Sequence, residues 1–365
     1  MKGLAVFVPA LAIAMAVQAG PVTVSPDGPL VRKLSEYNLF SDLASLTPND
    51  GVVPYDLNSP LFTDYADKYR FIWMPEGTSA TYDAVETFDF PVGTLISKTF
   101  SYPSEPGHPE KGMHHRETRV LLHRTSGWVA LPYVWNEEQT EANLAVAGAR
   151  DDIEIMTPSG DLKEIHYIVP NMNQCKACHE NQGALRPIGP KARHLNKDFA
   201  YPEGAKNQLS KLVEEGYLTG APENPADAPK LPQWDDVHTS LNDRARAYLD
   251  INCGHCHNPK GPAFTSGLDL TWMQDDPRQY GVYKPPVAAG RGSGGHRFSV
   301  VPGHPEQSIL LHRMSIDDPG SMMPQLGRTI EHAEGIQLIS DWIASLKPDE
   351  FDHLREVGDG GDQAP

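Results

Sequence analysis

Short apolar runs broken by turn-forming residues characterise the N-terminal half of the chain. Apolar or alternating runs occupy residues 70–73, 94–100 and 118–123, and Gly, Pro, Asp and Ser separate them. Runs of this length and punctuation are typical of β-strands. The pattern therefore predicts a mainly β domain over residues 36–170, with a long loop over residues 101–112, where Pro, Gly and charged residues gather.

Beyond this predicted β domain the pattern changes to short helical stretches set among loops. Four prolines over residues 222–232 indicate a linker. After the linker, the Ser240 hydroxyl can cap the amide of Asp243, so we expect a helix that runs on to Cys253. A last helix is expected before Pro348 from apolar residues at helical spacing: Ile336, Ile339, Ile343 and Leu346.

The first 19 residues predict a secretory signal peptide. One lysine precedes an apolar run over residues 4–17, and Ala19 offers a cleavage point before Gly20. The run is shorter than the roughly 20 residues of a membrane-spanning helix, and no comparable run follows it. We therefore expect a periplasmic or secreted protein without a stable membrane anchor.

The charge balance argues against nucleic acid as a partner. The 365 residues include 31 Lys and Arg against 48 Asp and Glu, which gives a net charge of −17, and no basic run occurs. A phosphate backbone would need a basic surface. An acidic chain instead favours encounter with a cationic surface, although acidic composition also serves solubility alone.

All four cysteines lie in two motifs of the form C-x-x-C-H. This motif is typical of covalent attachment of c-type haem. Two thiols separated by two residues can meet the two vinyl groups of one haem, and the next imidazole then lies beneath the iron as its proximal ligand. The sequence therefore predicts two haem c groups held by Cys175, Cys178, His179, Cys253, Cys256 and His257.

Other chemistries for these cysteines fit the sequence less well. A zinc ribbon usually has its cysteine pairs about 15–20 residues apart, whereas Cys175 and Cys253 are 78 residues apart. A thioredoxin-like dithiol needs a βαβ setting, which is not visible in the sequence. Disulfides within each motif remain open in an oxidising compartment, but they leave both histidines unexplained.

A candidate distal ligand for the second haem lies near the C-terminus. Met322 and Met323 precede Pro324 in a loop between Gly320 and Gly327, just before the last predicted helix. A thioether in such a stiffened loop can close a haem crevice from the side opposite His257. Two adjacent methionines also serve as core filler; we prefer Met323 as the iron ligand.

Residues 235–347 resemble a class I cytochrome c domain. The resembling residues are Arg244-Ala-Arg-Ala-Tyr248, the second C-x-x-C-H, Pro302-Gly303, Glu306-Gln307-Ser308, Met323-Pro324, and Gly335 with Trp342-Ile343. The resemblance implies a small all-α bundle, His257 and Met323 as iron ligands, and electron transfer. The expected fold is α+β and multidomain, with the β-rich domain, a first haem c segment over residues 171–225, and this all-α domain.

Most of residues 36–260 is also similar to an uncharacterised family of secreted bacterial di-haem cytochromes with an N-terminal β-rich region. The similar stretches are Asn58-Ser-Pro-Leu-Phe62-Thr-Asp-Tyr-Ala66, Phe90-Pro-Val-Gly93, Glu117-Thr-Arg119, Tyr133-Val-Trp135-Asn136 and Gly189-Pro-Lys-Ala-Arg193. No physiological role follows from this resemblance.

The distal ligand of the first haem stays open at this point. No methionine lies between Glu180 and Asp250. His194 is the first candidate, His238 is weaker, and residues 112–116 offer one methionine and two histidines. The first iron can also be five-coordinate or bind water.

Two functions from different classes follow from these expectations. The first is a periplasmic di-haem cytochrome that transfers electrons between redox partner proteins. The alternative is a di-haem peroxidase or oxidase with an open first haem, which needs acid, base or cationic groups near the iron. Candidates for those roles are His114, His115, Arg116, Glu117 and Arg193. A pure binding protein with structural haems is a third, weaker hypothesis.

Overall fold

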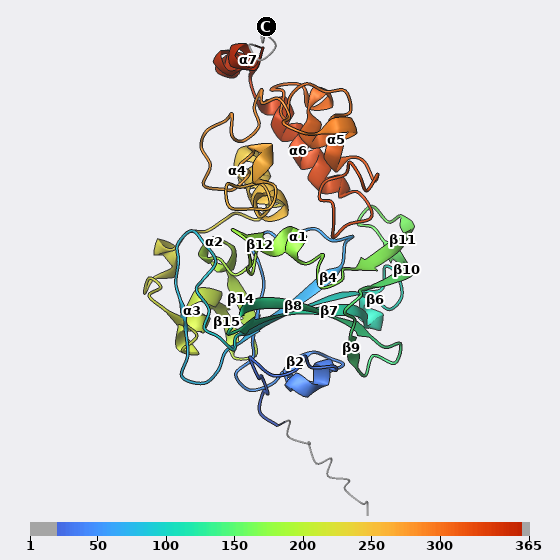
Figure 1. The fold of residues 1–365 in the computed structure, drawn as a ribbon, viewed down its shortest axis with the longest axis vertical. Helices are drawn as coiled ribbons and strands as arrows, with labels where there is room; N and C mark the ends of the chain where they lie inside the picture. The colour runs from blue at the N-terminus through green and yellow to red at the C-terminus, as the bar shows by residue number, and fades with distance from the viewer. Residues whose placement is uncertain (1–19, 360–365) are drawn as a thin grey trace, which may run out of the picture.

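A six-stranded antiparallel sheet lies at the centre of the computed structural model, which describes residues 20–359 (Figure 1). Its strand order is β3-β4-β6-β7-β8-β9. The strands are β3 (Val53–Tyr55), β4 (Asp67–Trp73), β6 (Leu95–Pro103), β7 (Met113–Arg124), β8 (Gly127–Trp135) and β9 (Ala142–Leu144). The three runs predicted as strands are confirmed, but β6 extends to Pro103, so the loop before β7 is shorter than expected.

Both faces of this sheet are covered by other parts of the chain. Successive side chains of a strand point to opposite faces, so each face has its own set of buried residues. One face contacts the N-terminal segment, which contains η1 (Leu34–Tyr37), β1 (Phe40–Asp42) and β2 (Thr47–Pro48). The other face contacts residues from 175 to 228. Cross-strand neighbours Ile72, Ile96, Leu121 and Ala130 form the core of this second face. Each large side chain of this kind contributes about 1.5–3 kcal/mol when fully buried.

The segment on the second face consists of short elements and carries the first cysteine motif. Its helices are α1 (Lys176–His179), α2 (Ala192–Leu195) and α3 (Gln208–Glu214). Its strands are β12 (Glu180–Asn181), β13 (Ala184–Leu185), β14 (Asp198–Tyr201), β15 (Gly204–Asn207) and β16 (Leu218–Thr219), the last parallel to β5 (Ala80–Thr81). A hairpin of β10 (Ala149–Met156) and β11 (Leu162–Val169) packs beside the sheet.

The C-terminal region lies on the far side of α1 from the sheet (Figure 1). It contains α4 (Leu241–Leu249), the π-helical η4 (Asp250–Gly254), α5 (Ile309–Met314), α6 (Ala333–Ser345) and α7 (Asp352–Asp359). The short 3-10 turns of the chain after β5 are η2 (Pro109–Lys111), η3 (Pro225–Asp227), η5 (Phe264–Ser266), η6 (Gly290–Ser293), η7 (Pro305–Gln307) and η8 (Pro348–Phe351).

The prediction of an all-α class I cytochrome c domain over residues 235–347 is wrong. The described chain is a mixed structure with 16 strands and seven short α-helices. Between α4 and α6 the backbone is mostly irregular, with two isolated parallel bridges, Val282 to Val300 and Phe298 to Ser308. Frequent Gly and Pro in this stretch favour turns over continuous helices.

Two local predictions in this region are confirmed. The Ser240 hydroxyl accepts a hydrogen bond of 3.1 Å from the Asp243 amide and so caps α4, which continues through η4 to the second cysteine motif. The last predicted helix is α6, which ends at Ser345, before Pro348. The predicted signal peptide lies outside the described residues. Within residues 20–359, no helix combines the length and the apolar character needed to cross a membrane.

Candidate functional site

The two C-x-x-C-H motifs lie against each other although 78 residues separate their first cysteines. The Sγ atoms of Cys178 and Cys256 and a ring nitrogen of His255 all lie within 4.8 Å of one another. The Cys256 thiol contacts the carbonyl of Ala177 at 3.5 Å. All four cysteines are free thiols, without a disulfide.

Backbone contacts hold the two motif loops together. The amide of Gln182, just after the first motif, donates to the carbonyl of Lys260 at 2.9 Å. Two reciprocal hydrogen bonds fix the segment just before the first motif. The Gln174 amide donates to the Asn171 side chain, and the Asn171 amide donates to the Gln174 side chain, each at 2.9 Å. Cys175 then packs into the core on the second face of the sheet.

The His179 imidazole has one ring nitrogen that could bind a metal. Its Nδ1 lies 2.8 Å from the carbonyl oxygen of Arg186. Because a carbonyl oxygen only accepts, Nδ1 carries the proton and Nε2 keeps its lone pair. Burial lowers the pKa of His179 to about 4, so the ring is neutral near pH 7.

The His257 ring is held in the same way as that of His179, except that the hydrogen-bond partner of its Nδ1 is a hydroxyl. Its Nδ1 lies 3.0 Å from Oγ of Ser266, and that hydroxyl donates its own proton to the carbonyl of Ala263 at 2.7 Å. Ser266 Oγ therefore accepts from Nδ1 of His257, which leaves Nε2 as the free lone pair. Burial lowers the pKa of His257 to about 4.

A cavity of about 570 Å³ lies beside the second motif. Its lining includes Cys253, Cys256, His257 and Met323. Met323, the predicted distal ligand, therefore lies at the same cavity as His257, the predicted proximal ligand. The Met323 backbone is fixed, since its amide donates to Arg313 and its carbonyl accepts from Arg328. Met322 is buried in the core, which favours the choice of Met323 over its neighbour.

Apolar side chains make up much of the remaining wall of this cavity, including Leu268, Leu270, Leu310, Met314 and Pro324. A cavity of several hundred cubic ångströms with an apolar wall and a few fixed polar groups fits a large organic cofactor.

A second cavity of about 300 Å³ lies beside the first motif. Its lining includes Cys178, His179, Lys191, His255 and Met273. Cys178 and His255 line both cavities, so these two side chains form the wall between them. The presence of Met273 and His255 beside the first motif could not be predicted from the sequence, because both residues lie far from this motif along the chain.

His194 lies elsewhere than predicted. It is buried, its Nε2 lies 3.0 Å from a carboxylate oxygen of Asp250, and it does not line the cavity beside His179. Arg193 donates to both oxygens of the same carboxylate at 3.0 Å. Burial alone would raise the pKa of Asp250, but the His194 hydrogen bond and the Arg193 charge hold it well below its usual range. Burial lowers the pKa of His194, so it joins the two motif-bearing segments as the hydrogen-bonded third member of a triad with the Arg193–Asp250 ion pair.

The residues suggested for peroxide chemistry are engaged in structural contacts. The His115 ring bonds Ser101 at 2.6 Å and the Ala44 carbonyl at 3.0 Å. Arg116 pairs with Asp151 on the surface. Of the five candidates, only Arg193 lines the cavity beside His179, and its guanidinium is already bonded to Asp250.

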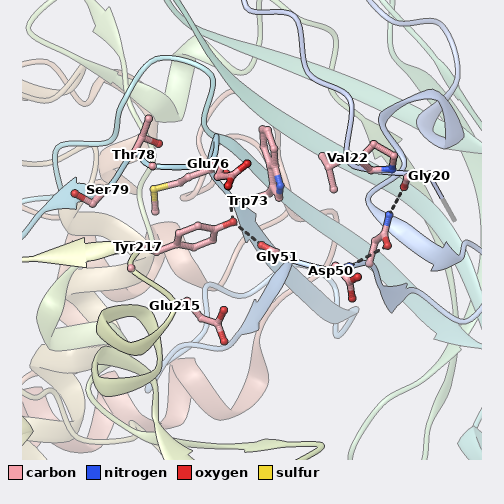
Figure 2. A pocket seen from close by; sticks show the side chains of 15 residues that line it. Gly20, Val22, Asp50, Gly51, Trp73, Glu76, Thr78, Ser79, Glu215 and Tyr217 are labelled. Atoms are coloured by element: carbon pink, nitrogen blue, oxygen red, sulfur yellow. Dashed lines mark hydrogen bonds between the residues drawn. The ribbon is translucent and has the colours of Figure 1, made fainter. Parts of the chain in front are cut away.

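A third cavity, of about 720 Å³, lies away from the motifs and is drawn in Figure 2. Trp73 and Tyr217 form its aromatic part, and Asp50, Glu76 and Glu215 give it acidic character. The Tyr217 hydroxyl donates to the Gly51 carbonyl at 2.6 Å. The lining contains no cysteine or histidine, so this cavity offers none of the chemistry predicted from the sequence.

No family model, no curated protein and no solved structure matches this chain. The resemblance to a family of secreted bacterial di-haem cytochromes with a C-terminal class I domain is therefore wrong. The stretches that suggested it reflect local motifs and one helix, while the loop-rich chain between them does not form that domain. What is established is a β-rich protein in which two C-x-x-C-H motifs form one continuous site.

Proposed function

We propose that this chain is an exported di-haem c-type cytochrome that passes electrons between two redox partner proteins. The observation that carries the proposal is that two C-x-x-C-H motifs, far apart in sequence, meet in space with Cys178 and His255 between their cavities. Two redox groups held side by side suit a relay, because an electron that arrives at one can pass to the other.

The residues present fit haem in number and kind, and the two imidazoles also fit in orientation. Each motif supplies two free thiols and a neutral imidazole whose Nε2 is available. Each thiol would add across a vinyl double bond, with sulfur bonded to one carbon and the thiol hydrogen to the other, so no oxidant is needed. Haem iron supplies a one-electron couple when bound. The Arg186 carbonyl and the Ser266 hydroxyl orient the imidazoles that would hold it.

Each cavity also contains a thioether that suits a distal position. Met323 lines the cavity of His257, and Met273 lines the cavity of His179. Met273 is exposed, so it is not there to fill the core. In this proposal each iron would be held by a methionine in addition to its histidine, which would favour electron transfer over peroxide turnover. The net charge of −17 favours a redox partner with a cationic surface.

The first test is the haem content of the mature protein made in a haem-competent host with export. Its intact mass should exceed that of the polypeptide by two haems, and the pyridine haemochrome should report two haems per chain. A matched pair of double variants, Cys175→Ala/Cys178→Ala and Cys253→Ala/Cys256→Ala, should each retain one haem. A wild-type protein with no covalent haem would refute the proposal.

A different metal chemistry has one observation in its favour. Cys178, His255 and Cys256 present three ligand atoms within 4.8 Å of one another, and such sulfur and nitrogen ligands suit zinc. This site and covalent haem compete for the same two cysteines. Metal analysis alongside the haemochrome separates them: one zinc per chain with free thiols favours the metal site, and zinc-free protein with two haems excludes it.

Replacing Met323 with alanine should lower the reduction potential of the second haem while leaving the haem attached. Methionine favours ferrous iron, and attachment depends on the cysteines. Any methionine-to-iron charge-transfer band of this haem should disappear. Met322→Ala is the matched control and should leave spectrum and potential unchanged; the reverse pattern would assign the ligand to Met322.

A further inference from the structure

One buried arginine holds the loop that carries Met323. Arg328 is buried, and its Nε donates to the Met323 carbonyl at 3.1 Å. Its terminal nitrogens donate to the carbonyls of Arg313, Ile316 and Ile330, at 3.2, 2.8 and 3.3 Å respectively. A guanidinium has several donors in a fixed plane. This single side chain therefore ties the start, the middle and the end of the loop after α5 to one another.

A carboxylate from the N-terminal region holds the next two residues of the same loop. Asp64, between β3 and β4, accepts hydrogen bonds from the Thr329 amide at 2.7 Å and from the Ile330 amide at 3.1 Å. The Thr329 hydroxyl also donates to this carboxylate, at 3.1 Å. Asp64 is only 2% exposed, so water has little access to these bonds. The contact joins residues that are 265 positions apart in the sequence.

The turn that contains Asp64 is itself fixed to the central sheet. The Asp64 carbonyl accepts a hydrogen bond of 3.0 Å from the Tyr102 hydroxyl on β6, and the Ala66 amide donates to the Thr63 carbonyl at 2.8 Å. Asp64 and Tyr65 have φ angles of 42° and 59°, which non-glycine residues rarely adopt. Such a backbone persists only where its surroundings hold it. The carboxylate thus lies on a rigid support.

The same turn also contacts the other side of the second cavity. The Phe62 amide donates to the Asn252 side chain at 2.8 Å, and Asn252 directly precedes Cys253. Phe62, Cys253 and Met323 line a common space of about 10 Å³. The turn therefore contacts the segment of an attachment cysteine and the loop of the candidate iron ligand at once.

We infer that Asp64 is a positioning residue for Met323. Asp64 bonds the two amides that follow Arg328, and Arg328 in turn bonds the Met323 carbonyl, so the thioether is kept at the cavity of His257. This inference rests on the proposed function and deepens it, because it gives the N-terminal region a role in holding the distal ligand of the second haem. A ligand that is already held in place loses less conformational entropy when it binds.

The test is Asp64→Asn in the full-length, haem-loaded protein. Asparagine keeps the shape of the side chain but replaces one acceptor oxygen with a donor, so the loop loses part of its support. Both haems should stay attached, and the methionine-to-iron charge-transfer band of the second haem should weaken. Added imidazole should displace the methionine with an affinity about tenfold higher or more, as expected for a lost hydrogen bond to a charged group.

The reduction potential separates loss of the ligand from loss of the charge. Weaker methionine binding lowers the potential of the second haem, whereas removal of a nearby negative charge alone raises it. We expect the potential to fall in Asp64→Asn. The matched control is Asp67→Asn, which removes an exposed carboxylate from the same segment and should leave the band and the imidazole affinity unchanged.

A double variant shows whether Asp64 acts through Met323. In the Met323→Ala background, Asp64→Asn should not change the imidazole affinity further, because the ligand that it positions is already absent. Amide hydrogen exchange offers a readout that does not depend on haem. In Asp64→Asn the exchange should quicken over residues 313–330 and stay as in the wild type in the central sheet.

Three results would overturn the inference. They are an unchanged band and imidazole affinity in Asp64→Asn, a rise in potential with the band intact, and an equal effect of Asp64→Asn with and without Met323. If Asp64→Asn does not accumulate, Thr329→Val removes one of the same hydrogen bonds from the loop side and should act in the same direction. The haemochrome count is taken first on the same samples. Two haems with unchanged ligand readouts would refute this inference alone, whereas a wild type without covalent haem would refute the proposed function.

Discussion

Replacing Asp250 with asparagine should destabilise the folded protein by about 3–5 kcal/mol, the usual cost of leaving buried charges without their partner. Asp250 is buried, and it accepts hydrogen bonds from Arg193, from His194 and from the Trp272 amide at 2.8 Å. The asparagine keeps the shape of the side chain but leaves the Arg193 guanidinium uncompensated. Urea denaturation of the haem-loaded protein measures the change.

The matched control is Asp151→Asn. Asp151 pairs with Arg116 at 3.0 Å, but its side chain is 51% exposed, so the loss should be at most about 1 kcal/mol. The effect of pH has a defined sign. Because the folded-state pKa of Asp250 is depressed, its contribution is present above the unfolded pKa of about 3.9 and is lost as the pH falls through the folded value. Equal losses in both variants would contradict the role of the triad.

The circular dichroism of the wild-type protein in the Soret region should show a couplet with one positive and one negative lobe. Such a couplet arises when two haems lie close enough for their transitions to mix. The Sγ atoms of Cys178 and Cys256 lie within 4.8 Å of each other, so haems bonded to them as proposed would have neighbouring edges. The couplet should be absent from both single-haem variants, Cys175→Ala/Cys178→Ala and Cys253→Ala/Cys256→Ala.

The control for this measurement is the sum of the two single-haem spectra. Far-ultraviolet circular dichroism should first show that both variants keep the wild-type fold. A wild-type Soret spectrum equal to that sum, in both oxidised and reduced protein, would mean that the haems are too far apart to interact. The electron relay would then lack the contact on which it is based.

Local features of the structure could be predicted from the sequence because their causes are local. The cap at Ser240 and the apolar periodicity of α6 depend on neighbouring residues alone. The C-x-x-C-H motifs are local in the same sense. The class I domain was a wrong prediction because a helix at each end of a segment does not determine the path of the chain between them.

Long-range contacts could not be predicted in this way. His194 is near His179 in sequence, which made it a reasonable candidate ligand, but Asp250 bonds its Nε2 atom. Met273 lies far from the first motif in sequence and still lines its cavity.

The burial of Cys175 bears on the order of events during biogenesis. The side chain is only 7% exposed, and its core also contains Ile251, so the site closes only once the second half of the chain has arrived. Leu34 and Tyr37 likewise belong to a core that extends to β9, so this core is complete only once β9 has formed. A chain translocated from its N-terminus would therefore stay open until late in export. In the proposed cytochrome, haem would have to reach Cys175 before this core closes.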